Sequence, residues 1–423
     1  MKNFSQRRFH KLHEQILLSR TFSLMLGWCI AVALPFLIHI GFSDISYIND
    51  GQANALWLSS IAFILSHTWC NSLTASYPGG RSAFLIAPQI FFVYLCVILG
   101  TFLFQINASR LIIITSGIIT LIWLYIEYIF TYKYRIPKLA IVVQPNTQEL
   151  LALNTIDARP ISIPILNEKR YDAIVADFAT ITPEWQRFLT QCALQRTPIY
   201  NANQIFESVT GRVRIRNMSE NNIGALLPSV FYERVKICLD WFMVIFTLPI
   251  TVPIILLTAI LVKLESPGPV FYTQSRIGQG NKPFTIYKIR SMRFDRAAPE
   301  KFAGEDDPRI TRVGKIIRKL RIDELPQFFN IIKGDMSLIG PRPEQPSFVE
   351  EFDKQIPFYS YRHVVKPGIT GWAQVRQGYT ANSDETKIKI EHDFYYIKNC
   401  SISFDFYIIL LTIRTMLTGF GAR

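Results

Sequence analysis

The chain has 423 residues, more than a single hydrophobic core usually serves, so its length predicts two or more folding units. Hydrophobic residues make up 49% and charged residues 18%, with a mean hydropathy of +0.20, which excludes an ordinary cytosolic enzyme and indicates a membrane protein. A formal net charge of +13 shows that the polar parts are basic and favours anionic partners. The cysteines are scattered without a Cys-x-x-Cys pair, which argues against a zinc site or a disulfide framework.

The first third of the chain is predicted to be a membrane bundle. Residues 1–20 form a basic tail, and the apolar stretch after it lacks a small-residue cleavage site, so we expect a retained anchor. Four apolar segments follow at 21–42, 53–70, 83–104 and 111–131, and the second is shorter than the ~20 residues that cross a bilayer. Cations in the tail and at 133–138, against Asp44 and Asp50 in the loop 43–52, place both ends of this four-helix bundle (21–132) in the cytoplasm.

Residues 133–222 are predicted to form a Rossmann-like α/β domain on the cytosolic side. Short β-type runs at 139–143, 161–165 and 171–178 alternate with helical stretches such as 183–195, which is typical of a parallel sheet. The turn after the first strand, residues 144–147, has no glycine-rich phosphate cradle. We therefore expect a structural or dimerising module rather than a dinucleotide site, and with it a homodimer.

The apolar run at 231–264 is long enough to span a membrane, but Pro249 and Pro253 interrupt its middle. Cations flank both ends, so neither end has a reason to leave the cytoplasm. We expect a break at the prolines and a re-entrant helical hairpin that enters the inner leaflet and returns. A fifth, kinked span is the alternative.

Residues 265–423 carry the patterns that indicate chemistry. Lys288 and Arg290 recur at strand spacing, and a helix-like segment at 307–320 sets an apolar stripe against cations that include Arg318. Asp323 and Glu324 precede Pro326; they either cap a helix or form a site that holds Mg²⁺ while one carboxylate stays nucleophilic. Glycine-proline turns at 333–343 and 366–375 bear Arg342 and Lys366 and could direct backbone amides and cations at a phosphate.

Together and in this order, these patterns resemble the bacterial sugar transferase family, the polyprenyl-phosphate hexose-1-phosphate transferases. The resemblance covers residues 231–423 and rests most on three strings at 323–327, 333–343 and 366–375. A membrane bundle, an α/β module and a terminal catalytic unit are also the layout of the long-chain members. The resemblance implies a helix-rich, mixed catalytic domain that is monotopic and lies at the cytoplasmic face of the bacterial inner membrane.

The resemblance also implies roles for individual residues. Asp323 would be the nucleophile that attacks the β-phosphate of a UDP-sugar and releases UMP, and Glu324 its partner acid, with both beside Mg²⁺. Undecaprenyl phosphate would then take the sugar phosphate from the enzyme. Lys288, Arg318 and Arg342 would bind the diphosphate, and we count Arg290 and Lys366 with them from their patterns.

This sequence departs from the family pattern at two positions. Val252 stands where many members have serine before the hairpin proline, Pro253, which leaves the geometry of the break open. Ile289 replaces an aromatic residue, which we take as a packing change.

Three other functions remain as alternatives. A non-catalytic membrane scaffold or regulator of polysaccharide assembly would use the basic domain only to dock on anionic lipid. A nucleic-acid binder fits the charge, but the cations lie in glycine-proline turns beside membrane segments, so we expect no nucleic acid as a partner. A metal-dependent glycosyltransferase would use residues 305–307 and release UDP instead of UMP. No motif encodes which sugar or which polysaccharide pathway is served.

Overall fold

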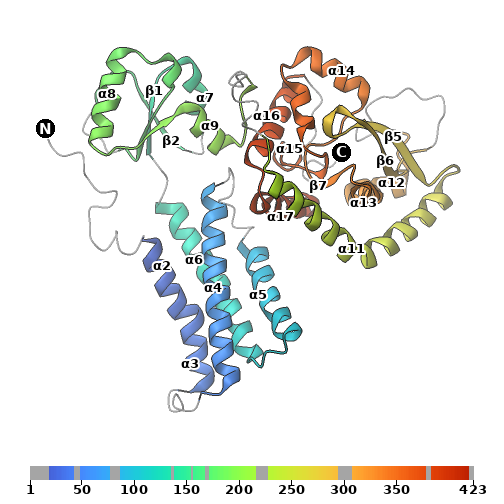
Figure 1. Cartoon of the computed structure of the whole chain (residues 1–423), viewed down its shortest axis with the longest axis horizontal. Helices are drawn as coiled ribbons and strands as arrows, with labels where there is room; N and C mark the ends of the chain where they lie inside the picture. The colour runs from blue at the N-terminus through green and yellow to red at the C-terminus, as the bar shows by residue number, and fades with distance from the viewer. Residues whose placement is uncertain are drawn as a thin grey trace. The chain divides into compact units, whose positions relative to one another are not determined.

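The structure is a computed structural model that describes residues 19–41, 48–76, 86–134, 138–153, 156–166, 171–215, 227–293, 307–377 and 383–418 (Figure 1). The chain forms two compact units, Met1–Gly211 and Arg212–Arg423. Most of the predicted basic tail, the bundle loop with Asp44, and residues 305–306 of the alternative metal motif lie outside the described residues.

The predicted membrane bundle is present as helices. A continuous helical path runs through α2 (Arg20–Trp28), η1 (Cys29–Ala33) and α3 (Leu34–Ile40), and is followed by α4 (Asp50–Ser76), α5 (Ile86–Leu103) and α6 (Arg110–Tyr134). Within the part of the chain that the structure describes, four helices are long and apolar enough to cross a membrane: Arg20–Ile40, Ile86–Leu103, Arg110–Phe130 and Val230–Glu265. The second predicted span lies in α4, which is long but not among them, because polar residues such as Ser59, Ser66 and His67 interrupt its apolar sequence.

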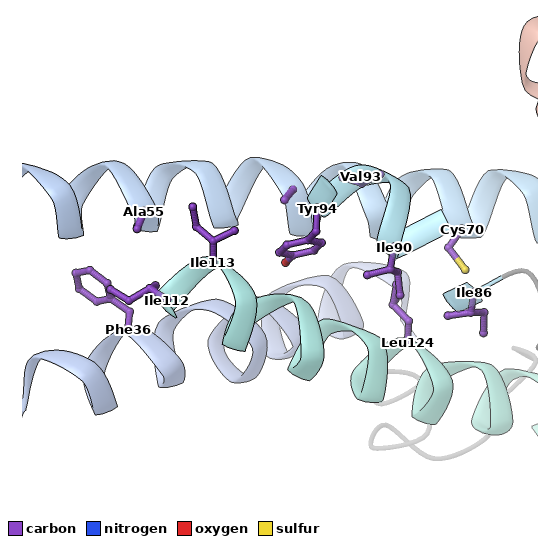
Figure 2. Close-up of a cluster of buried hydrophobic side chains, with 11 residues drawn as sticks. Phe36, Ala55, Cys70, Ile86, Ile90, Val93, Tyr94, Ile112, Ile113 and Leu124 are labelled. Carbon is purple, nitrogen blue, oxygen red and sulfur yellow. The ribbon is translucent and has the colours of Figure 1, made fainter. Parts of the chain in front are cut away.

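Side chains from α3, α4, α5 and α6 form the core of the bundle (Figure 2). Phe36, Ala55, Ile90, Ile113 and Leu124 are among its buried members. Many outward-facing side chains are apolar as well, among them Leu99, Phe102, Leu103, Ile118 and Ile122. A bundle that is apolar on both its inner and its outer side is suited to lipid rather than water.

The α/β domain contains a four-stranded parallel sheet in the order β2-β1-β3-β4, so the predicted parallel sheet is confirmed. Helices cover both faces, because one core cluster joins the sheet to α7 and α9 and another joins it to α8. The Rossmann-like topology goes beyond this sheet and stays a prediction. The bounds are β1 Lys138–Val142, η4 Pro145–Thr147, α7 Gln148–Leu151, β2 Asp157–Ile161, β3 Ala173–Ala176, η5 Phe178–Thr180, α8 Pro183–Leu194, β4 Ile199–Asn201 and α9 Ala202–Thr210.

The second strand was predicted at the wrong place. The alternating isoleucines at 161, 163 and 165 predicted a strand there, but β2 ends at Ile161, and Ile163 and Ile165 are exposed. Among the described strands, β2 pairs only with β1, so it is an edge strand and tolerates Pro160, which has no backbone donor.

The second unit contains α11 (Val230–Glu265), an antiparallel hairpin of β5 (Phe271–Ile277) and β6 (Pro283–Ile289), and a parallel pair of β7 (Ser337–Ile339) and β8 (Gly368–Thr370). Trp372 packs edge to face on Phe404 with the ring centroids 5.0 Å apart, at the centre of an aromatic core. Val213 N donates to Glu391 O, and the division between the two units lies between Gly211 and Arg212. The remaining elements are η8 Gln279–Asn281, α12 Arg312–Lys319, η9 Ile322–Gln327, α13 Phe328–Lys333, α14 Pro346–Gln355, η10 Tyr359–Val364, α15 Trp372–Arg376, α16 Ser383–Asn399 and α17 Ile402–Thr418.

The helix α11 passes through Pro249 and Pro253 without interruption, so the break that we expected there is a bend, visible in Figure 1. A proline removes one backbone donor and crowds the preceding turn, which bends a helix that neighbouring contacts hold together. Both halves pack on the same unit. Val244 joins a cluster with Ile286, and Val262 joins one with Ile289, which confirms Ile289 as a packing position.

Candidate active site

The two adjacent carboxylates lie on η9, a short 3₁₀-helix that packs against β6. Thr311 caps the preceding helix α12 by accepting a hydrogen bond from Gly314 N. After α12 the backbone of Arg321 is left-handed, with a φ of 55°, and turns the chain into η9. This turn separates Asp323 and Glu324 from α12 and brings them beside the end of β6.

Glu324 is the centre of a cluster of cations. Its Oε1 accepts from Arg342 Nη2 at 2.7 Å and from Lys288 Nζ at 3.2 Å, and Arg321 Nη1 lies 3.6 Å from its Oε2. The carboxylate is buried, which by itself would raise its pKa, but Arg342, Lys288 and Arg321 hold the pKa of Glu324 below its usual value. Glu324 is therefore an ionised carboxylate that fixes two cations in place.

Asp323 is only partly buried, and its surroundings shift its pKa in the opposite direction to that of Glu324. Desolvation, and next the charge of Glu324, raise the pKa of Asp323 above its usual value, although Lys288, Arg342 and Arg318 oppose the shift. A carboxylate with a raised pKa is more basic than an ordinary aspartate and a better nucleophile. The two adjacent acids thus have pKa values shifted in opposite directions.

The carboxylates also offer oxygen atoms for a divalent cation. Glu324 Oε2 is buried and makes no hydrogen bond, with Arg321 Nη1 3.6 Å away, so this oxygen has the capacity to act as a ligand. No group of three or more His, Cys, Asp or Glu side chains that could hold a metal occurs in the described residues. Mg²⁺ commonly takes one or two carboxylates and completes its shell with substrate phosphates and water, so the donor set fits Mg²⁺.

The two glycine-proline motifs are packed directly on each other. A Cβ at Gly368 would lie 2.1 Å from Gly340 N, and a Cβ at Gly371 would lie 2.2 Å from Gly340 O. Gly340 N donates to Thr370 O, and Gly368 N donates to Pro341 O, next to the parallel pairing of β7 with β8. Only glycine permits the two backbones to approach this closely. The contact holds the loop that leads from Gly340 to Arg342.

The structure brings some of the predicted cations together but not all of them. Lys288 and Arg342 contact Glu324, and Arg318 acts on Asp323 through its charge. The guanidinium of Arg290 is buried and donates instead to the carbonyls of Pro267 (2.6 Å) and Ser266 (2.8 Å), directly after α11. Lys366 Nζ lies beside Gly334, at the end of α13.

Sequence reasoning missed two arginines that hold the loop of Arg342. Arg276 Nη1 donates to Pro343 O at 3.1 Å, and Arg362 Nη2 donates to Arg342 O at 2.8 Å. Neither belongs to the three strings that carried the family resemblance. Their positions depend on folding contacts between distant segments, for which the sequence offers no local signal.

Residues 231–419 match the sequence model of a family described as bacterial sugar transferase. A relative from Aeromonas hydrophila, named UDP-N-acetylgalactosamine-undecaprenyl-phosphate N-acetylgalactosaminephosphotransferase, is 45% identical over 421 residues, which cover 99% of both chains. The chain belongs to the bacterial sugar transferase family. The predicted family and the predicted class of enzyme are thereby confirmed.

Two further relatives of this sugar transferase are similar to parts of it. Both are named UDP-glucose:undecaprenyl-phosphate glucose-1-phosphate transferase. The Escherichia coli K12 protein is 42% identical over 166 residues, 38% of this chain and 35% of its own. The Caulobacter vibrioides protein is 40% identical over 198 residues, 46% of this chain and 74% of its own.

The packing of Gly340 on Gly368 leads to a prediction. Gly368→Ala places a methyl group against backbone atoms that cannot move aside, so we expect it to lower the free energy of unfolding by about 2 kcal/mol. Thermal unfolding of the purified protein in detergent checks this. Gly100→Ala is the control, because a Cβ there meets nothing within 4 Å. An unchanged unfolding transition for Gly368→Ala would show that the two motifs are not in backbone contact.

Proposed function

We propose that this chain transfers a hexose-1-phosphate from a UDP-sugar to undecaprenyl phosphate through a covalent intermediate on Asp323. One Oδ atom of Asp323 attacks the β-phosphorus of the donor, the bond from that phosphorus to the oxygen of the α-phosphate breaks, and UMP leaves. The phosphate of undecaprenyl phosphate then attacks the same phosphorus. The aspartyl bond breaks, undecaprenyl diphosphate-sugar forms, and the carboxylate is regenerated.

The observation that carries this proposal is the arrangement around Asp323. A more basic, partly exposed carboxylate lies beside an ionised, buried one that fixes Arg342 and Lys288. Transfer of a phosphoryl group from one anion to another needs fixed positive charge along its path and in-line positioning. A covalent intermediate lets a soluble donor and a lipid acceptor use the site in turn rather than together.

The relatives support the choice of substrates. The Aeromonas relative, which matches 99% of the chain, is named for N-acetylgalactosamine, while the Escherichia coli and Caulobacter vibrioides relatives, which match less than half of the chain, are named for glucose. We therefore propose UDP-N-acetylgalactosamine as the first donor to test. The reaction would be the first membrane step of exopolysaccharide, capsule or O-antigen synthesis.

The proposal has a direct test in the nucleophile. Asp323→Asn keeps the size of the side chain but removes its nucleophilic oxygen, so we expect transfer to fall at least ~1,000-fold. The measurement is UMP release and transfer of radiolabelled sugar phosphate into lipid, with membranes and undecaprenyl phosphate supplied. Asp335→Asn, on the turn after α13, is a matched control and should retain activity. Full transfer by Asp323→Asn would favour a different nucleophile, and release of UDP would favour a glycosyltransferase.

We also propose that Asp323 and Glu324 hold Mg²⁺ when the donor is bound. The ion would neutralise charge on the diphosphate. Glu324 Oε2, buried and without a hydrogen bond, supports this assignment. We expect a chelator of divalent cations to abolish UMP release and added Mg²⁺ to restore it. Undiminished turnover after exhaustive chelation would leave the lysine and arginine cluster as the whole source of charge neutralisation.

We propose further that α11 is re-entrant, with both ends on the cytoplasmic face of the inner membrane. At its start, Lys236 Nζ and Tyr232 OH each lie 2.7 Å from Asp405 Oδ2 on α17. At its end, the carboxylate of Glu265 accepts from the backbone of Arg312 (2.7 Å) and Val313 (3.0 Å) at the start of α12. Both ends are thus bound to one folded unit.

A transmembrane α11 would conflict with these contacts. Its 36 residues would form a straight rod of about 54 Å, which exceeds the ~30 Å hydrocarbon core and would place its two ends on opposite sides. One face of the bent helix packs on the unit, and the other exposes residues such as Phe242, Phe246, Ile250, Leu256 and Ile260 to lipid. A bend near Pro249 and Pro253 lets this apolar side enter one leaflet and return.

Cysteine labelling tests this topology. Single cysteines at Ser229 and Leu264, in a chain whose own cysteines are replaced, should both react with a membrane-impermeant thiol reagent only after the cells are opened. A cysteine in the tail at Ser5 is the control for the cytoplasmic side. Labelling of either α11 end in intact cells would identify a fifth span.

A further inference from the structure

The loop that carries Arg342 has no secondary structure of its own. Residues 340–345 connect β7 to α14, and Arg342 is in the middle of them. Its guanidinium nevertheless has to stay within hydrogen-bond distance of Glu324. The main chain around it must therefore be fixed by contacts from other elements.

Two arginines hold consecutive carbonyls of this loop. Arg362 on η10 donates to Arg342 O at 2.8 Å, and Arg276 on β5 donates to Pro343 O at 3.1 Å. The next carbonyl, of Glu344, accepts from Ile277 N at 3.0 Å. The backbone of Arg342 is thus held by a side chain from outside the loop.

Arg362 is itself fixed on two further sides. Its Nη2 donates to Asp393 Oδ2 on α16 at 2.8 Å, and its Nη1 donates to Tyr359 OH at 3.0 Å. The side chains of Arg362 and Asp393 are each only 2% exposed, so neither can touch a substrate. A planar guanidinium can make these three hydrogen bonds at fixed angles, whereas a lysine ammonium cannot reproduce that fork.

We propose that Arg362, held by Asp393 and Tyr359, is a positioning residue that sets the location of the Arg342 guanidinium through its backbone carbonyl. The proposal rests on the proposed function, because Arg342 is there the cation that meets both Glu324 and the donor diphosphate. Arg362 acts only through Arg342. Its loss should therefore lower kcat/KM while the fold is retained, and the effect should depend on the Arg342 side chain.

The test is a double-mutant cycle on UMP release from UDP-N-acetylgalactosamine. Arg362→Lys keeps the charge but not the fork, and we expect it to lower kcat/KM roughly tenfold. In an Arg342→Gln background, where no guanidinium remains to be positioned, the same change should cost less than about twofold. Equal factors in both backgrounds, or full activity of folded Arg362→Lys, would overturn the proposal.

Two more variants complete the design. Glu391→Gln is the matched control, because Glu391 lies on the same helix as Asp393. The change removes the ion pair of Glu391 with Arg212 (3.7 Å) and should leave kcat/KM unchanged. Tyr359→Phe deletes one hydroxyl that accepts from Arg362, and it replaces Arg362→Lys in the double-mutant cycle if that variant is not recovered folded. With Arg342 intact, we expect Tyr359→Phe to lower kcat/KM about two- to threefold. If the unsubstituted protein releases no UMP, the proposed function is refuted. If the protein is active but the Arg362 and Tyr359 variants keep its full kcat/KM, only this inference is refuted.

Discussion

The ion cluster around Glu324 is the interaction on which the candidate active site depends. A buried carboxylate is costly unless cations and hydrogen bonds compensate it. Here Lys288 and Arg342 come from separate segments to do so, and Arg321 comes from the turn directly before η9. Removing any one of them would weaken the compensation of this buried charge. The cluster therefore fixes β6, η9 and the Arg342 loop relative to each other.

The same cluster explains why the adjacent acids differ. Glu324 is surrounded by cations and stays ionised, while Asp323 has lost solvent and faces the charge of Glu324, so it becomes more basic. One carboxylate organises positive charge, and in the proposed mechanism the other attacks the donor. Adjacent residues of one 3₁₀-helix can have these two roles because their side chains leave the helix in different directions.

Much of this site could be predicted from the sequence. The string at 323–327 and the cations Lys288 and Arg342 are part of a recognisable pattern, and the structure places both cations on Glu324. The membrane helices follow from long apolar runs, and the parallel sheet follows from the alternation of strand and helix signals. These features depend on local composition or on a dense motif.

Other features depend on contacts between distant residues, which no local pattern encodes. Arg290 was grouped with Lys288 by strand spacing, but β6 ends at Ile289 and Arg290 binds the turn after α11 instead. The second strand of the α/β domain lies at 157–161, but it was predicted at 161–165. The alternating isoleucines there gave a stronger strand signal than the true edge strand, which contains a proline. Arg362 and the Lys236–Asp405 pair join segments far apart in the chain. Dimerisation through the α/β domain stays a prediction.

The central claim is that the Asp323 carboxylate becomes covalently bonded to the sugar phosphate. Intact-protein mass spectrometry, on enzyme incubated with UDP-N-acetylgalactosamine in the absence of undecaprenyl phosphate, measures this directly. The account predicts a mass increase of one N-acetylhexosamine phosphate, located by peptide mapping on Asp323 and lost when undecaprenyl phosphate is added. UMP release and lipid product without any such adduct, or an adduct on another residue, would contradict it.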